Sequence, residues 1–92
     1  MVAPLSPAPP VKIRRLPQEQ EGKCQFSGQF VTTRNALDHF GQEVILVAWL
    51  MLKTMVSKGV PLDYLQVFEI NGERLWIIDD GDVVTALLPE DY

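Results

Sequence analysis

The chain has 92 residues, a formal net charge of −4, one cysteine and one histidine. This length suits one small domain, and 47% hydrophobic residues are enough for a small core. One cysteine cannot form an intrachain disulfide, and one cysteine with one histidine cannot build a structural zinc site. The mild acidity argues against binding of nucleic acid, which needs a basic surface. We therefore expect no metal, no cofactor and no nucleic-acid partner.

Residues 1–22 are expected to form a disordered, proline-rich tail ahead of a single α+β domain at residues 23–92. Four of the first ten residues are proline, which disfavours helix and favours polyproline II. The basic stretch at residues 11–16 is either a linear docking motif or a chance cluster of charges. No apolar segment follows a basic start, so we predict no secretory signal and a cytoplasmic protein.

Two short extended pieces and a short helix are predicted before the main helix. Residues 24–26 and 29–32 have the composition of short extended pieces around a Ser-Gly pair. Thr32 and Thr33 then supply an N-cap for a short helix over residues 34–40, which Gly41 ends.

The pattern at residues 42–58 predicts the one long helix. Its apolar run covers residues 44–52, about half of what a membrane span needs, so we expect a buried helix and no membrane partner. Gly59 is a suitable residue just past the end, and Pro61 prevents continuation. At 100° per residue, one broad apolar arc contains Val44, Ile45, Ala48, Trp49, Met51, Leu52, Met55 and Val56.

Three large apolar residues of this helix lie outside that arc. Leu46, Val47 and Leu50 share the opposite side with Glu43 and Lys53. A small sheet covers only one side of a helix. These three side chains therefore predict a second contact, made by the tail or by another chain.

The last third of the chain predicts a three-stranded antiparallel meander over residues 61–70, 73–78 and 83–88. Asn71-Gly72 and Asp80-Gly81 suit two-residue type I′ turns. Read as such loops, they place Ile70 opposite Glu73 and Ile78 opposite Val83. Alternation then gives one core face, made of Phe68, Ile70, Leu75, Ile77, Val84, Ala86 and Leu88.

The opposite face of this meander is also too apolar to be left in water. It includes Val67, Trp76 and Ile78, so we expect cover from the N-terminal half, a second copy or a partner. With Leu46, Val47 and Leu50, these three residues are the predicted partner-binding set.

The sequence offers little catalytic chemistry. His39 and Glu43 are four residues apart, but Gly41 between them makes a shared helical face doubtful. We recognise no phosphate-binding loop, nucleophile elbow or Cys/His arrangement, and expect no enzymatic activity. The acidic set of Asp79, Asp80 and Asp82 is either a solvated turn or a negative patch for a basic partner.

Two stretches resemble a family of small bacterial proteins from plasmids, prophages and other mobile elements. Residues 28–38 are similar to the family's Gly-Gln-x-Val-Ala-Thr-Pro-Gly-Ala-Leu-Glu opening. Residues 75–78 and 84–92 are similar to its Ile-Trp-Ile-Ile-Thr and Thr-Thr-x-Leu-Leu-Pro-Glu-Glu-Tyr ending. The middle differs, because the family has a Gly-Asp-Trp-Gly segment and a polar helix there. The resemblance implies a fold and a mobile-element origin, and no catalytic residue carries over.

These observations predict a non-enzymatic protein-interaction module, acting as a homodimer or as a small subunit of a larger assembly. A mobile-element inhibitor of a host complex is one form of it, with acidity mimicking nucleic acid. The alternative is a small RNA-cleaving toxin of a toxin–antitoxin pair, because a helix followed by a meander occurs in such toxins. The net charge and the single histidine argue against the toxin.

Overall fold

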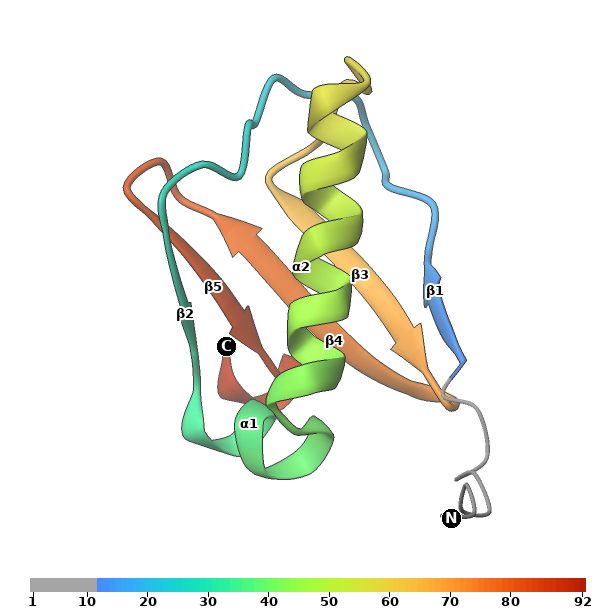
Figure 1. The fold of residues 1–92 in the computed structure, drawn as a ribbon, viewed down its shortest axis with the longest axis vertical. Coiled ribbons are helices and arrows are strands. Elements are labelled where there is room, and N and C mark those ends of the chain that lie inside the picture. Colours follow the sequence, from blue (N-terminus) through green and yellow to red (C-terminus); the bar gives the residue numbers. More distant parts are fainter. Residues whose placement is uncertain (1–11) are drawn as a thin grey trace, which may run out of the picture.

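A five-stranded mixed sheet carries both helices on one of its faces (Figure 1). The computed structural model describes residues 12–92. The order of strands across the sheet is β1-β3-β4-β5-β2. The elements are β1 (Ile13–Arg15), β2 (Gln29–Thr32), α1 (Arg34–Phe40), α2 (Gln42–Ser57), β3 (Leu65–Ile70), β4 (Glu73–Asp79), β5 (Val83–Leu87) and a C-terminal 3-10 turn, η1 (Pro89–Asp91).

Both helices begin where the sequence predicts, α1 also ends there, and α2 ends at Ser57, one residue before the predicted end. Thr33 caps α1 by accepting a hydrogen bond from the Ala36 amide at 3.1 Å, and Gly41, with φ of 86°, separates α1 from α2. Gly59 follows the end of α2 with φ of 79°, a conformation that costs glycine little. Ile45, Ala48 and Leu52 are the most deeply buried residues of α2, and the other members of the predicted arc pack around them.

The predicted meander and its first hairpin are confirmed. Ile70 pairs with Glu73 and Val67 with Trp76, as a two-residue Asn-Gly loop requires. Asn71 and Gly72 both have positive φ, 51° and 87°, as both central residues of a type I′ turn must.

The predicted register of the second hairpin is wrong by two residues. Ile78 pairs with Thr85, and Asp79 with Val84, because the chain turns at Gly81-Asp82. Asp79 Oδ1 accepts a hydrogen bond from the Gly81 amide at 2.8 Å and thereby holds the two-residue turn one residue later than predicted. A shift of two residues preserves alternation. The seven residues of the predicted core face are accordingly all buried against the helices.

Residues 12–22 differ from the expected tail, while residues 1–11 lie outside the described part. β1 adds to the sheet beside β3, and the Leu16 amide continues this pairing to Val67 O at 2.8 Å. A buried glutamine on β3 explains the attachment. Gln66, 1% exposed, accepts a hydrogen bond from Arg15 Nη1 at 2.7 Å and donates one to Gln18 Oε1 at 2.8 Å. A buried amide needs such partners.

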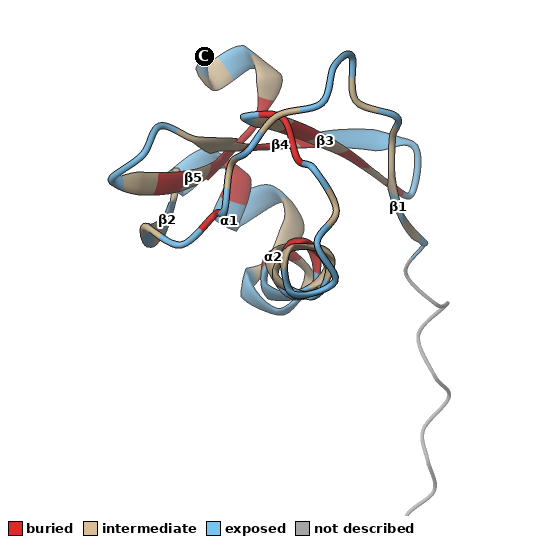
Figure 2. Ribbon diagram, turned by 90° about the horizontal axis from the view of Figure 1, so that it is seen from above, coloured by how far each residue is buried: buried red, intermediate tan, exposed pale blue. Residues whose placement is uncertain are grey.

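The predicted extended piece at residues 29–32 forms the opposite edge of the sheet as β2, whereas the piece predicted at residues 24–26 forms no strand. β2 pairs in parallel with β5, so that Phe30 lies beside Val84 and Thr32 beside Ala86. The outer side of β2 has no neighbouring strand among residues 12–92. Figure 2 shows β2 and β1 at opposite ends of the sheet, with the helices beneath it and η1 above it.

Candidate functional site

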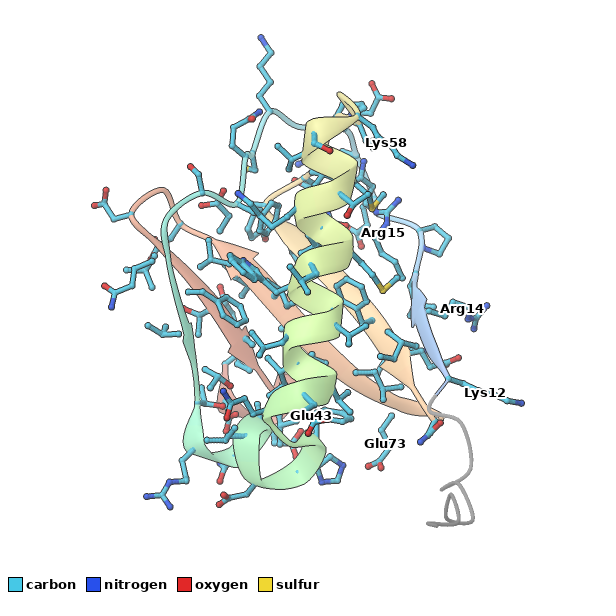
Figure 3. The ribbon with its side chains drawn as sticks, in the orientation of Figure 1. Lys12, Arg14, Arg15, Glu43, Lys58 and Glu73 are labelled. Carbon is cyan, nitrogen blue, oxygen red and sulfur yellow. The ribbon has the colours of Figure 1, made fainter. Side chains whose placement is uncertain are left out.

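The outer side of α2 carries exposed apolar side chains, as the sequence predicts. Leu46 is 37% exposed, Val47 45% and Leu50 54%. Figure 3 shows this helix in front of the sheet, with Glu43 near one end and Lys58 near the other. A helix face that packed only on its own sheet would place polar side chains at these positions.

Two further residues extend this surface towards the edge of the sheet. Val31 on β2 and Leu37 on α1 are each 36% exposed. They line, with Leu46, a hollow of about 280 Å³ between the edge strand and the two helices. We call the five residues Val31, Leu37, Leu46, Val47 and Leu50 the apolar strip. Sequence reasoning missed Val31 and Leu37, because only the strand order reveals that β2 is an edge.

The strip rests on a rigid contact between β2 and α2. The rings of Phe30 and Trp49 stack with centroids 5.0 Å apart and planes 22° from parallel. Lys53 Nζ donates to Phe26 O at 3.3 Å and lies 6.0 Å from the Trp49 ring, so the end of the stack is also held. These contacts hold the edge strand against the helix.

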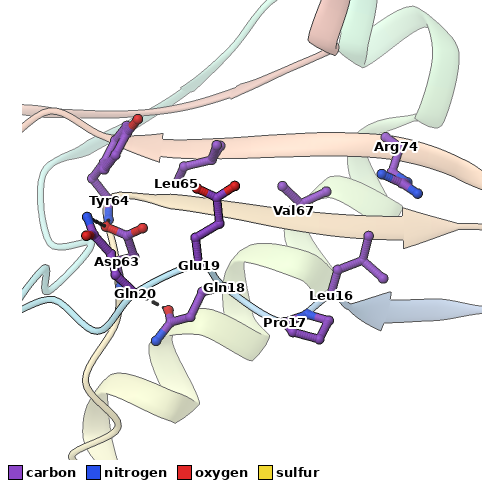
Figure 4. Close-up of a pocket in the computed structure, with 10 residues that line it drawn as sticks. All are labelled: Leu16, Pro17, Gln18, Glu19, Gln20, Asp63, Tyr64, Leu65, Val67 and Arg74. Atoms are coloured by element: carbon purple, nitrogen blue, oxygen red, sulfur yellow. Dashed lines mark hydrogen bonds between the residues drawn. The ribbon is translucent and has the colours of Figure 1, made fainter.

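The second predicted surface, on the other face of the sheet, is partly covered by the chain itself. Trp76 meets Tyr92 edge to face, with ring centroids 5.8 Å apart. Val67, together with Leu65, lines a hollow of about 320 Å³ (Figure 4). The far wall of this hollow is the N-terminal segment from Leu16 to Gln20. Trp76, Val67 and Ile78 are therefore half-buried, and this face is a weaker docking candidate than the strip.

The predicted acidic set serves the second hairpin. Asp79 is half-buried, and its Oδ2 accepts a hydrogen bond from the Phe26 amide at 3.0 Å. Asp80 Oδ1 accepts from the Val83 amide at 2.9 Å. Asp80 and Asp82 remain exposed at the tip. The tip is thus an ordered turn that carries a local negative charge. It lies beside the start of β2, because Gln29 N donates a hydrogen bond to Asp82 O at 3.1 Å.

His39 contacts the carboxylate of Glu73, and not that of Glu43, four residues further along the chain. His39 Nε2 lies 2.6 Å from Glu73 Oε1 at the start of β4, and both side chains are exposed. Arg74 shares a hollow of about 280 Å³ with this pair.

The single cysteine is not activated as a nucleophile. Burial and the nearby Asp79 and Asp63 carboxylates raise the pKa of the Cys24 thiol, which disfavours the nucleophilic thiolate.

Within residues 12–92 no group of three or more His, Cys, Asp or Glu residues is arranged to hold a metal ion. No single helix in that part of the chain is long and apolar enough to cross a membrane. α1 and α2 together reach the length and composition, but they meet at 104°.

The fold and its surface define a small α+β protein with a mixed sheet, one covering helix layer and an exposed apolar strip. Comparisons with family models, with curated proteins and with solved structures found no match. The similarity to plasmid- and prophage-borne proteins stays an expectation drawn from the two motifs.

Proposed function

We propose that this protein is a non-enzymatic protein-interaction module that works as a homodimer, with the apolar strip as its contact surface. The observation that carries the proposal is the exposure of all five strip residues, between 36% and 54%, on three adjoining elements. Scattered apolar residues are ordinary on a protein surface, whereas three of these five, Val31, Leu37 and Leu46, line one hollow, and such a group marks a contact site.

The strip is a better candidate than the outer face of the sheet. Tyr92 and the segment before Glu21 already contact that face, and Trp76 is half-buried there. A second copy is the default occupant of the strip, because most soluble oligomers are homo-oligomers and two-fold dimers are the commonest. A mobile-element inhibitor that docks on a host complex would use the same strip on a different protein.

The test replaces Leu50, the most exposed strip residue of α2, with glutamate. Leu50→Glu places a charge in the interface, so sedimentation equilibrium should show a monomer with the wild-type melting temperature. Thr54→Glu, one turn further along the same exposed side, is the matched control and should leave the dimer intact. A dimer that tolerates Leu50→Glu would contradict the proposal. So would a wild-type monomer that Leu50→Glu simply unfolds.

The RNA-cleaving toxin remains the second candidate because His39, Glu73 and Arg74 surround one hollow. An imidazole and a carboxylate can share general acid–base work, and a guanidinium can hold a phosphate. Both members of the pair are exposed, which suits an ordinary surface contact equally well. Growth arrest on expression that His39→Ala abolishes would favour the toxin over the interaction module.

A further inference from the structure

The two edges of the sheet are protected very differently. β1 is three residues long and brings Lys12, Arg14 and Pro17 to its edge. Natural proteins use such charges and prolines to stop other strands from pairing with an edge. The β2 edge has none of them, since residues 25–33 contain neither a charge nor a proline.

The unprotected edge also presents unused backbone groups. The Gln29 amide donates to Asp82 O, just before β5, at 3.1 Å, and the Thr33 amide donates to Ala86 O on β5 at 2.9 Å. Because successive residues of a strand point their backbone groups to opposite sides, those of Phe30 and Thr32 point outwards. These two residues are placed evenly on either side of Val31.

We infer that two copies of the chain pair through β2, antiparallel about a two-fold axis at Val31, to form one continuous ten-stranded sheet. This inference rests on the proposed homodimer and places its contact at the end of the apolar strip nearest the sheet edge, at Val31, Leu37 and Leu46. Phe30 of each copy then bonds Thr32 of the other, which satisfies all the outward groups of both residues. Both helix layers lie on one side of the joined sheet, and the hollows beside Leu37 and Leu46 face the interface.

The charges around the edge favour a second copy in this orientation. Arg34 is exposed just beyond the C-terminal end of β2. The acidic tip, with Asp80 and Asp82 exposed, lies beside its N-terminal end. An antiparallel partner brings its Arg34 to this acidic tip, and the contact occurs twice by symmetry. The strand between them is neutral, so no like charges face each other along the paired strands themselves, although each chain carries a net charge of −4.

The first test places a charge on the proposed axis. Val31→Lys puts two lysines directly opposite each other, so the dissociation constant of the dimer should rise at least roughly tenfold. Val31→Thr is β-branched and neutral, and should stay within about threefold of wild type. Circular dichroism should show both variants folded, because Val31 lies at the sheet edge and is 36% exposed.

The second test exchanges charges across the interface. Arg34→Glu should weaken the dimer roughly tenfold, because two surface ion pairs become repulsive. Adding Asp82→Lys to Arg34→Glu should recover most of the affinity, which a merely structural role for Arg34 would not produce. High salt should flatten both effects.

The decisive readout is amide exchange at two concentrations. The amides of Phe30 and Thr32 should become slower to exchange as the concentration rises, whereas that of Val31, directed at β5, should not change. A dimer that survives Val31→Lys, with concentration-independent exchange at Phe30 and Thr32, would overturn edge pairing and leave the homodimer standing. A protein that is monomeric at every concentration would overturn both the edge pairing and the homodimer. This holds even if an extended segment of another protein is found to pair with β2.

Discussion

The side chains of Gln18 and Gln66 are joined by a hydrogen bond of 2.8 Å, although 48 residues separate them in sequence. Gln18 Oε1 also accepts from the Asp63 amide at 3.0 Å, and Gln18 Nε2 donates to Pro61 O at 2.8 Å. The half-buried side chain of Gln18 thus connects the N-terminal segment to the residues around the start of β3. This contact makes residues 12–22 part of the domain.

Gln18→Ala should destabilise the protein by about 1–2 kcal/mol, because the buried amide of Gln66 loses an acceptor. Urea unfolding measures this loss, and exchange of the Leu16 amide should quicken with it. Glu19→Ala is the control, since Glu19 is exposed beside it. Equal stabilities for the two variants would show that the glutamine network does not hold the segment.

Trp49→Phe should change stability by less than about 1 kcal/mol, despite the loss of a large ring. Trp49 Nε1 is buried and has no hydrogen-bond partner in the described part of the chain, so its removal relieves an unsatisfied donor. The phenyl ring retains a stacking partner for Phe30. Trp49→Ala, which removes the stack, should cost about 3 kcal/mol in thermal or urea unfolding. Equal losses for both substitutions would contradict this account of the indole.

Trp76→Ala should cost about 2 kcal/mol, below the roughly 3–5 kcal/mol of a fully buried tryptophan. The side chain is half-buried, and Tyr92 packs against its ring edge to face. Tyr92→Ala serves as the comparison and should cost less, because Tyr92 is 82% exposed. A loss well under about 0.5 kcal/mol for Trp76→Ala would mean that this face contributes no packing.

Asp91 should give the fold an acid-sensitive contact. Hydrogen bonds from Asn35 and Thr33, and then from the Leu88 amide, lower the pKa of the Asp91 carboxyl. A carboxyl with a lowered folded-state pKa contributes stability fully above its ordinary pKa of about 3.9. That contribution disappears as the pH falls through the lower folded-state value.

Asp91→Asn should therefore melt below wild type at neutral pH, and the two melting temperatures should converge under strongly acidic conditions. Thr33 is both the cap of α1 and a donor to Asp91, so the loosened contact lies between α1 and η1. Glu90→Gln is the control, because Glu90 is exposed in the same turn. A constant difference between Asp91→Asn and wild type at every pH would contradict the assignment.

The sequence was most informative where the structure is local. The cap at Thr33, the break at Gly41 and the Asn71-Gly72 turn follow from residues whose conformational preferences are strong. The register predicted for the second hairpin is wrong because Asp80-Gly81 also suits a type I′ turn. Asp79 instead makes contacts to Gly81 and, far away in sequence, to Phe26, and these hold the turn one residue later.

The candidate site was only half visible in the sequence. Helical periodicity alone identifies Leu46, Val47 and Leu50. Apolar residues on the polar arc of a helix can be recognised without knowing the tertiary structure. Val31 and Leu37 gain their significance from the position of β2 at the sheet edge, which depends on pairing across more than 50 residues. The polar segment before Glu21 has no periodic apolar pattern from which its position could be predicted. It is attached to the sheet by individual side-chain hydrogen bonds, among them the one between Gln18 and the buried Gln66.

The central claim is that this chain associates with itself through the apolar strip. Light scattering of the purified protein, from about 0.1 to about 100 µM, tests it most directly by giving the molar mass at each concentration. The account predicts a mass that rises from one chain to two and stops there, as a closed two-fold contact requires. A mass of one chain across the whole range would contradict it.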